Sequence, residues 1–211
     1  MPRRGRLKRL RTHILVANIA YLGRNRRDAD ARPTLLSVSM PEDEHSTDPS
    51  ADCIQRAYLY LTRDLDTGGP PLRADEIKLM AFDPDDVTRL VRLQPTTAWR
   101  RGDLHPGLSE RRRSSNWEYE LAKVRTYFTE GVVTRLLDAI EPHAAGITEA
   151  CAALGMRAGI NVVIEMIGDR NTASGNLHVS TAAITYTAQT LKRLAQLDLS
   201  VDHDQYVFLP D

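Results

Sequence analysis

The chain has 211 residues, of which 42% are hydrophobic, and its 28 lysines and arginines are balanced by 28 aspartates and glutamates. No apolar run reaches the ~18 residues of a membrane helix, and the neutral total excludes net charge as the basis for binding nucleic acid or an acidic membrane. Cys53 and Cys151 lie in apolar stretches, which favours buried, unpaired thiols in a reducing cytoplasm over a disulfide between them.

The first 52 residues form a leader that is basic and then acidic. Basic side chains predominate before position 33, where Asp28 and Asp30 are the acids, and residues 42–52 carry acids without lysine or arginine. We expect a disordered leader, with a nucleic-acid-binding arm as the alternative, because clustered basic side chains neutralise phosphates. The side chains of that arm are Arg3, Arg4, Arg6, Lys8, Arg9 and Arg11. A secretion signal is disfavoured because its apolar stretch is short, and Met40 is an alternative start that would remove the arm.

The first regular elements are predicted after this leader. Residues 57–62 alternate between aliphatic side chains and tyrosine or threonine, which predicts a strand. Residues 64–76 hold paired glycines and prolines and are predicted to be a loop or a hairpin insertion. Asp83 then has the side chain of an N-cap and Pro84 suits the first helical position, so a helix is expected there, ending before Pro95.

The middle of the chain predicts a strand followed by helical segments. Residues 117–121 alternate between large apolar and acidic side chains, as in a half-buried strand. Apolar residues then recur at helical spacing over 133–140, up to Pro142, and again over 147–154, up to Gly155. These are two helices or one broken helix.

The last part of the chain predicts a central strand at 160–167, because this run is nearly continuously apolar and rich in β-branched residues. A turn follows at 170–176 and a shorter strand at 177–179. An amphipathic helix is expected over 184–195 and a closing strand over 199–208.

This order of elements predicts one α+β domain over residues 53–211. Its sheet is expected to be mostly antiparallel with helices packed on one face, in a ferredoxin-like or duplicated βαβ arrangement.

Several blocks of the chain, in this order, resemble the bacterial family known as domain of unknown function 4279 over about residues 55–208. The blocks are the capped helix with Pro95, Trp99, Gly102 and Trp117 after it, and the sequences WEYEL, LLDAIEP, INVVIEMIGD and TLKRLAQLDLSVDHDQY. The resemblance implies a type of domain and attaches no reaction to it. An Asp and a Tyr of the closing strand recur, matched here to Asp202 or Asp204 and to Tyr206, without a catalytic role.

The loop from Trp99 to Trp117 is the candidate binding surface, because aromatic anchors and arginines often supply binding hot spots. The predicted partner-binding residues are Trp99, Arg100, Arg101, Asp103, His105, Arg112 and Trp117. They suit another protein, an anionic ligand or a phosphate backbone. The competing interpretation places both tryptophans at the edge of the core and leaves the arginines in solvent.

Asp202 and Asp204, with Glu165 from another strand, form an alternative metal site. In a regular strand Asp202 and Asp204 share a face while His203 points away, so these ligands do not converge without a bulge. We therefore expect solvated carboxylates, no metal and no cofactor.

The sequence has no phosphate-binding loop, dinucleotide fingerprint, nucleophile elbow or zinc-binding helix motif. We therefore expect a non-catalytic, cytoplasmic interaction or regulatory domain of the toxin-neutralising type, with another protein as its partner. A metal-dependent hydrolase or nucleic-acid-processing enzyme that uses Asp202, Asp204 and Glu165 is the first alternative. Nucleic-acid binding through the basic arm is the second.

Overall fold

Strand β2 (Cys53–Thr62) lies inside the main sheet and has one fully buried face. The computed structural model describes residues 12–13, 50–63, 73–170 and 176–209. Buried and partly exposed positions alternate strictly along β2, so Leu59 and Leu61 face the core. The strand predicted at 57–62 is therefore confirmed, and it begins at Cys53.

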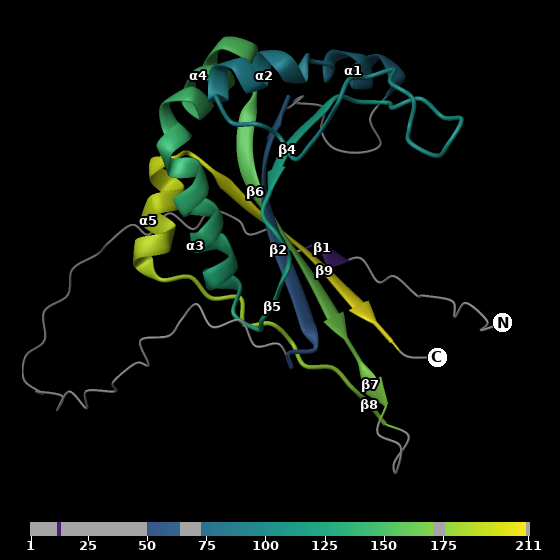
Figure 1. The fold of residues 1–211 in the computed structure, drawn as a ribbon, viewed down its shortest axis with the longest axis vertical. Coiled ribbons are helices and arrows are strands. Elements are labelled where there is room, and N and C mark those ends of the chain that lie inside the picture. The colour runs from purple at the N-terminus through teal and green to yellow at the C-terminus, as the bar shows by residue number, and fades with distance from the viewer. Residues whose placement is uncertain (1–11, 14–49, 64–72, 171–175, 210–211) are drawn as a thin grey trace, which may run out of the picture.

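Besides β2, the main sheet contains β1 (Thr12–His13), β3 (Thr97–Trp99), β4 (Asn116–Glu120), β5 (Val124–Arg125), β6 (Arg157–Ile167) and β9 (Ser200–Phe208). Their spatial order is β1-β9-β6-β2-β4-β3, with β5 also paired to β2 (Figure 1). All of these pairs are antiparallel except β6 and β9, which run parallel. Strands β7 (Asp169–Arg170) and β8 (Leu177–His178) form a separate antiparallel ribbon.

The helical elements are α1 (Ala74–Leu79), α2 (Pro84–Val91), α3 (Thr129–Ile140), the 3₁₀ turn η1 (Glu141–His143), α4 (Ala144–Leu154) and α5 (Ala188–Gln196). Figure 1 shows α3 and α5 against one face of the sheet, and α2 and α4 near one end of it. The opposite face carries no helix of the part of the chain that the structure describes. We call it the helix-free face; it is formed by the even-numbered residues of β2 and β9 and the residues of β6 paired with them.

The predicted class is confirmed: the chain is α+β, with a mostly antiparallel sheet and helices packed on it. The more specific plans are not found. A ferredoxin-like or duplicated βαβ arrangement requires two parallel crossover units. Here β2 pairs directly and antiparallel with β4, and the parallel crossover of the described sheet is the single unit β6-α5-β9.

Helix α2 begins as predicted and ends earlier. Asp83 caps it, since its Oδ1 accepts a hydrogen bond from Asp85 N at 3.0 Å. The helix stops at Val91 because Arg92 adopts the left-handed conformation with a φ of 58°, so Pro95 does not mark its end.

Two other boundaries also differ from the prediction. Residues 74–79 are helical where a loop was expected through residue 76, and the Glu76 carboxylate accepts a hydrogen bond from Arg73 N at 2.6 Å. Helix α5 begins at Ala188, because the Thr187 side chain accepts the hydrogen bond of Thr190 N. The helical segments expected on either side of Pro142, as two helices or one broken helix, are confirmed: α3 and α4 follow each other through η1, and Gly155 ends α4 with a φ of +61°.

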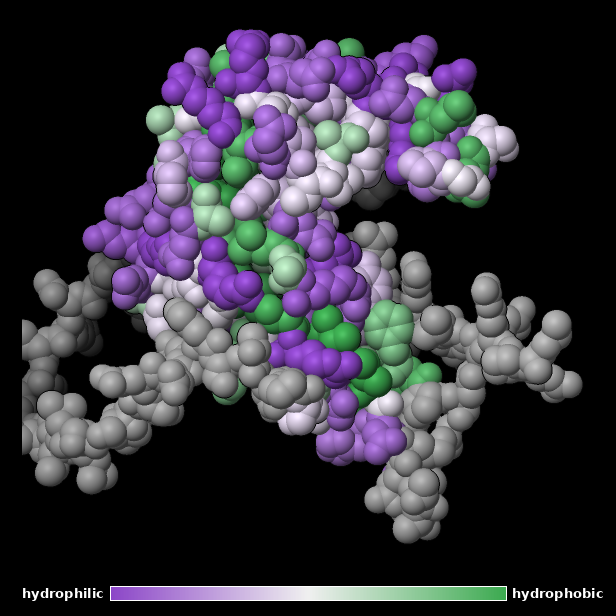
Figure 2. All heavy atoms as spheres, in the orientation of Figure 1, coloured by the Kyte–Doolittle hydropathy of each residue, from purple (hydrophilic) through white to green (hydrophobic). Residues whose placement is uncertain are grey.

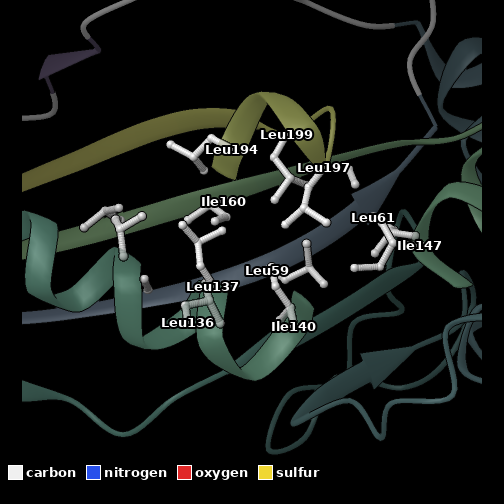
Figure 3. Close-up of a cluster of buried hydrophobic side chains, with 14 of the residues drawn as sticks. Leu59, Leu61, Leu136, Leu137, Ile140, Ile147, Ile160, Leu194, Leu197 and Leu199 are labelled. Atoms are coloured by element: carbon white, nitrogen blue, oxygen red, sulfur yellow. The ribbon is translucent and has the colours of Figure 1, made fainter. Parts of the chain in front are cut away.

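The hydrophobic core lies between the sheet and the helices. Figure 3 shows Leu59 and Ile160 of the sheet facing Leu137 of α3, with Leu194 of α5 close by. Fully burying such a side chain contributes roughly 1.5–3 kcal/mol. A buried polar group, Gln55, is fully paired here: its Nε2 donates to Thr126 O and its Oε1 accepts from Thr129 Oγ1, both at 2.9 Å.

Cys53 and Cys151 are free thiols, as the sequence predicts. Burial raises the pKa of each thiol, so the reactive thiolate is disfavoured at both positions. Within the described ranges, every helix is too short or too polar to cross a membrane.

Candidate functional site

The loop that joins β3 to β4, residues 100–115, is a structured extension of that hairpin, and we call it the β3–β4 loop. Gly102 N donates to Arg112 O at 2.8 Å, and further out His105 N donates to Glu110 O at 2.9 Å. Gly102 has a φ of +94°, a conformation that favours glycine. Backbone hydrogen bonds therefore hold most of the loop in one conformation.

Trp99 and Arg112 brace the base of this loop. Trp99 Nε1 donates to Ser114 O at 3.0 Å, across the hairpin. The Arg112 guanidinium lies over the Trp99 ring, 4.0 Å from its centroid, in a cation–π contact. The two predicted binding residues therefore also have a structural role, because they fix each other and the loop.

Arg100 attaches the loop to the beginning of α2, and Asp103 holds Arg100 within the loop. The Arg100 guanidinium pairs with Asp83 at 2.8 Å and also with Asp85. Arg100 N donates to the Asp103 carboxylate at 2.7 Å, and Asp103 O accepts from Arg112 N at 2.7 Å. The backbone N–H of Asp85 and the Arg100 guanidinium hold the pKa of Asp83 below its usual range, so this anchor stays charged.

Trp117 lies apart from the loop surface. Its side chain is 0% exposed and belongs to the core, and its Nε1 donates to Thr88 Oγ1 of α2 at 3.0 Å. The register of β4 places Trp117 opposite Ala98 of β3. Of the predicted partner-binding residues, this one therefore has no surface with which to touch a partner.

The outer part of the loop exposes two large apolar side chains. Leu104 is 62% exposed and Leu108 is 56% exposed. The same loop also exposes Arg101, Arg111 and Arg113. Figure 1 shows the loop projecting on the side away from α3 and α5, and Figure 2 shows hydrophobic residues at the projecting end. The sequence prediction missed both leucines, although apolar residues in an otherwise polar loop were a usable signal.

The carboxylates of the alternative metal site do share the helix-free face, but each has its own partner. Asp202 accepts from Tyr60 OH at 2.6 Å, and Asp204 accepts from Asn161 Nδ2 at 3.1 Å. Glu165 pairs with Lys123 Nζ at 3.0 Å. In the part of the chain that the structure describes, no group of three His, Cys, Asp or Glu side chains is placed to hold a metal ion.

His203 points to the opposite face, as the strand period predicts. It is buried, and its Nε2 lies 2.6 Å from Tyr186 OH. The basic side chains of the predicted nucleic-acid-binding arm, Arg3, Arg4, Arg6, Lys8, Arg9 and Arg11, all lie outside the described residues.

Comparison with protein families gives one match. Residues 72–208 match the family described as domain of unknown function (DUF4279). The chain belongs to this family, which confirms the resemblance that its sequence blocks predict. The matched range includes the β3–β4 loop and strands β6 and β9. No curated protein and no solved structure matches the chain.

Proposed function

We propose that this DUF4279 domain is a non-catalytic protein-interaction domain, and that the β3–β4 loop is the surface that binds its partner. The observation that carries the proposal is the exposure of Leu104 and Leu108 on a loop that is held in place by hydrogen bonds and ion pairs. Exposed apolar side chains surrounded by polar ones are typical of protein interaction sites.

The fixed conformation of the loop supports this role. A loop that is ordered before binding loses little conformational entropy in the complex, so more of the contact energy appears as affinity. Two side-chain bonds that order the loop lie at its base. They join Trp99 to Ser114 and Arg100 to Asp83, and they involve neither Leu104 nor Leu108. Leu104 and Leu108 thus remain available as anchors.

The charge of the loop indicates the chemistry of the partner. Arg101, Arg111 and Arg113 are exposed on the same loop as the two leucines, and arginine is enriched at binding hot spots. The partner is therefore a protein with an apolar pocket and an acidic rim, whose association slows as salt increases. We assign the domain a regulatory role of the toxin-neutralising type, in which binding itself controls the partner.

The test is affinity capture from the native host with the full chain, followed by mass spectrometry and a binding titration of the retained protein. The double variant Leu104→Glu/Leu108→Glu is expected to weaken binding by roughly tenfold or more, since it removes both apolar anchors. Leu191→Glu is the matched control, because Leu191 is 52% exposed on α5, on the other side of the molecule.

A second substitution tests the electrostatic part of the same surface. Arg101→Glu is expected to weaken capture most at low salt, because it reverses a charge at the rim. All variants should melt within a few degrees of the natural chain. Equal capture by the leucine double variant and by Leu191→Glu would show that the loop is not the binding surface.

A further inference from the structure

We propose that the helix-free face holds a second site, separate from the β3–β4 loop, that binds an organic cation through an ammonium or guanidinium group. The site, which we call the acceptor site, is formed by Tyr58 and Tyr60 of β2, Asn161 of β6, and Asp202 and Asp204 of β9. It does not depend on the function proposed above, because none of its residues belongs to the loop.

The strand register brings these side chains together. Asn161 of β6 is paired with Tyr58 of β2 on one side and with Asp202 of β9 on the other. Its Nδ2 donates to Tyr58 OH at 2.7 Å and to Asp204 Oδ2 at 3.1 Å, while Tyr60 OH donates to Asp202 Oδ2 at 2.6 Å. Each aspartate is therefore held by one oxygen and keeps the other for a ligand.

The two aspartates have no ion-pair partner among residues 50–63, 73–169 and 176–209: no Lys, Arg or His nitrogen of these residues forms a salt bridge with either. The nearby arginines bind other groups. Arg56 pairs with Glu120 at 2.5 Å, and Arg157 donates to Tyr60 OH at 3.0 Å. The charges of the two aspartates are therefore not directly paired by these side chains, and an added cation could pair with them.

Asn161 supplies a second, independent indication of a ligand. It is only 9% exposed, and its Oδ1 is buried without a hydrogen-bond partner among the described residues. Leaving a buried acceptor without a hydrogen bond destabilises the folded state by about 1–3 kcal/mol, so such groups are rare in folded proteins. The Nδ2 bonds to Tyr58 and Asp204 fix the amide within the acceptor site, so its Oδ1 is an unused acceptor of the same group.

The chemistry of the free groups selects the ligand. The remaining oxygens of Asp202 and Asp204 and the Oδ1 of Asn161 are all acceptors, which suits a group that only donates. Ammonium and guanidinium groups are cations that donate hydrogen bonds and accept none. The tyrosine rings also suit a cation, and they already have arginine neighbours: the Arg157 guanidinium lies 5.6 Å from the Tyr60 ring centroid.

The absence of a side chain at Gly159 leaves room for the Tyr60 ring in this site. A Cβ at Gly159 would lie 2.4 Å from Tyr60 Oη, so a larger residue would push the tyrosine away from the sheet. Because position 159 is glycine, the Tyr60 ring lies across β6 and its hydroxyl reaches Asp202. Tyr60 is thus a positioning residue that sets the direction of one carboxylate.

The test is calorimetric titration of the full chain with spermidine, with arginine methyl ester and with a short arginine- and lysine-containing peptide. Asp202→Asn and Asp204→Asn are each expected to weaken binding by about tenfold, since each removes a charged acceptor from the cation. Asp198→Asn is the matched control, because Asp198 is exposed and has a φ of 51°, a conformation that asparagine tolerates.

The ligands distinguish the possible sources of the cation. Binding of the free amines supports a small-molecule ligand, and binding of the peptide alone supports a basic side chain of a polypeptide. No binding of any of the three overturns the proposal, as does equal weakening by Asp198→Asn. Binding of Mg²⁺ or Ca²⁺ without the organic cations overturns it in favour of a metal site. Melting curves and circular dichroism of each variant separate loss of binding from loss of the fold.

Discussion

The two tryptophans of the β3–β4 hairpin have different structural roles. Trp117 is fully buried and bonded to Thr88, whereas Trp99 is half-buried and stacked by Arg112. Trp117→Ala is expected to lower the free energy of unfolding by about 3–5 kcal/mol, as other large-to-small core changes do. Trp99→Ala should cost about 1 kcal/mol, the typical effect of a partly exposed residue. Urea titrations followed by far-UV circular dichroism measure both, and equal losses would contradict this assignment.

His203 is expected to make the stability of the folded chain depend on pH. Burial lowers the pKa of its imidazole, with Asp202 opposing this in part, and Tyr186 OH lies 2.6 Å from Nε2. Above the unfolded pKa of about 6.5 the imidazole is neutral in both states, so its burial costs nothing extra. Below that pH the unfolded chain binds a proton that the folded chain resists, and stability falls until the lower folded pKa is reached.

We therefore expect the free energy of unfolding to decrease between pH 7 and pH 5, in urea titrations at each pH. His203→Gln should reduce that decrease, because it removes the titrating group. His178→Gln is the control, since His178 is exposed on β8. A pH dependence that is the same in all three proteins would place the responsible group elsewhere.

At the scale of elements, helices α2 and α4 approach each other at a glycine. A Cβ on Gly146 would lie 2.4 Å from Leu90 O and 2.9 Å from Val91 Cα, both backbone atoms. Alanine is the better helix former by about 1 kcal/mol, but here the overlap outweighs that gain. Gly146→Ala is expected to lower the free energy of unfolding by about 1–3 kcal/mol. Ala145→Ser, at an exposed neighbour, should change it by less than about 0.5 kcal/mol, and a stabilising Gly146→Ala would contradict the close approach.

The sequence predicts elements where a local signal decides the structure. Asp83 and Pro84 mark the start of α2, and Gly155 marks the end of α4, because caps act within one turn. The end of α2 was not predictable in this way. Arg92 adopts a left-handed conformation that its side chain type rarely takes, so the residue type at this position gives no signal that the helix ends there.

The candidate sites likewise combine features that local sequence predicts with features that depend on strand pairing. The β3–β4 loop is predictable as a polar, arginine-rich connection, but the burial of Trp117 depends on the pairing of β4 with β3 and β2. The acceptor site is even harder to predict from the sequence. It requires the parallel register of β6 and β9, which places Asn161 beside Asp202 across a separation of about forty residues that no local pattern encodes.

At the scale of the whole molecule, the neutral composition conceals two surfaces of opposite character. The β3–β4 loop exposes three arginines and two leucines, and the helix-free face carries two aspartates without an ion-pair partner among residues 50–63, 73–169 and 176–209. If each surface binds the ligand proposed for it, net charge says little about recognition, because charges act over about a Debye length of 8–10 Å. Under both proposals, ligands of opposite charge would bind the same chain at separate sites.

The last prediction concerns the single domain expected over residues 53–211. The hydrophobic core described between Cys53 and Leu199 already joins the sheet to α2, α3, α4 and α5, so this part of the chain has the contacts of a cooperative unit. A fragment of residues 50–211 is expected to unfold in one transition, within about 4 °C of the full chain, since 1 kcal/mol shifts the melting temperature by roughly 2–4 °C at this size. Calorimetry measures both properties, and two transitions or an unfolded fragment would contradict a single domain. The same pair of proteins tests the basic arm: salt-dependent DNA binding that the fragment lacks would assign it to the leader.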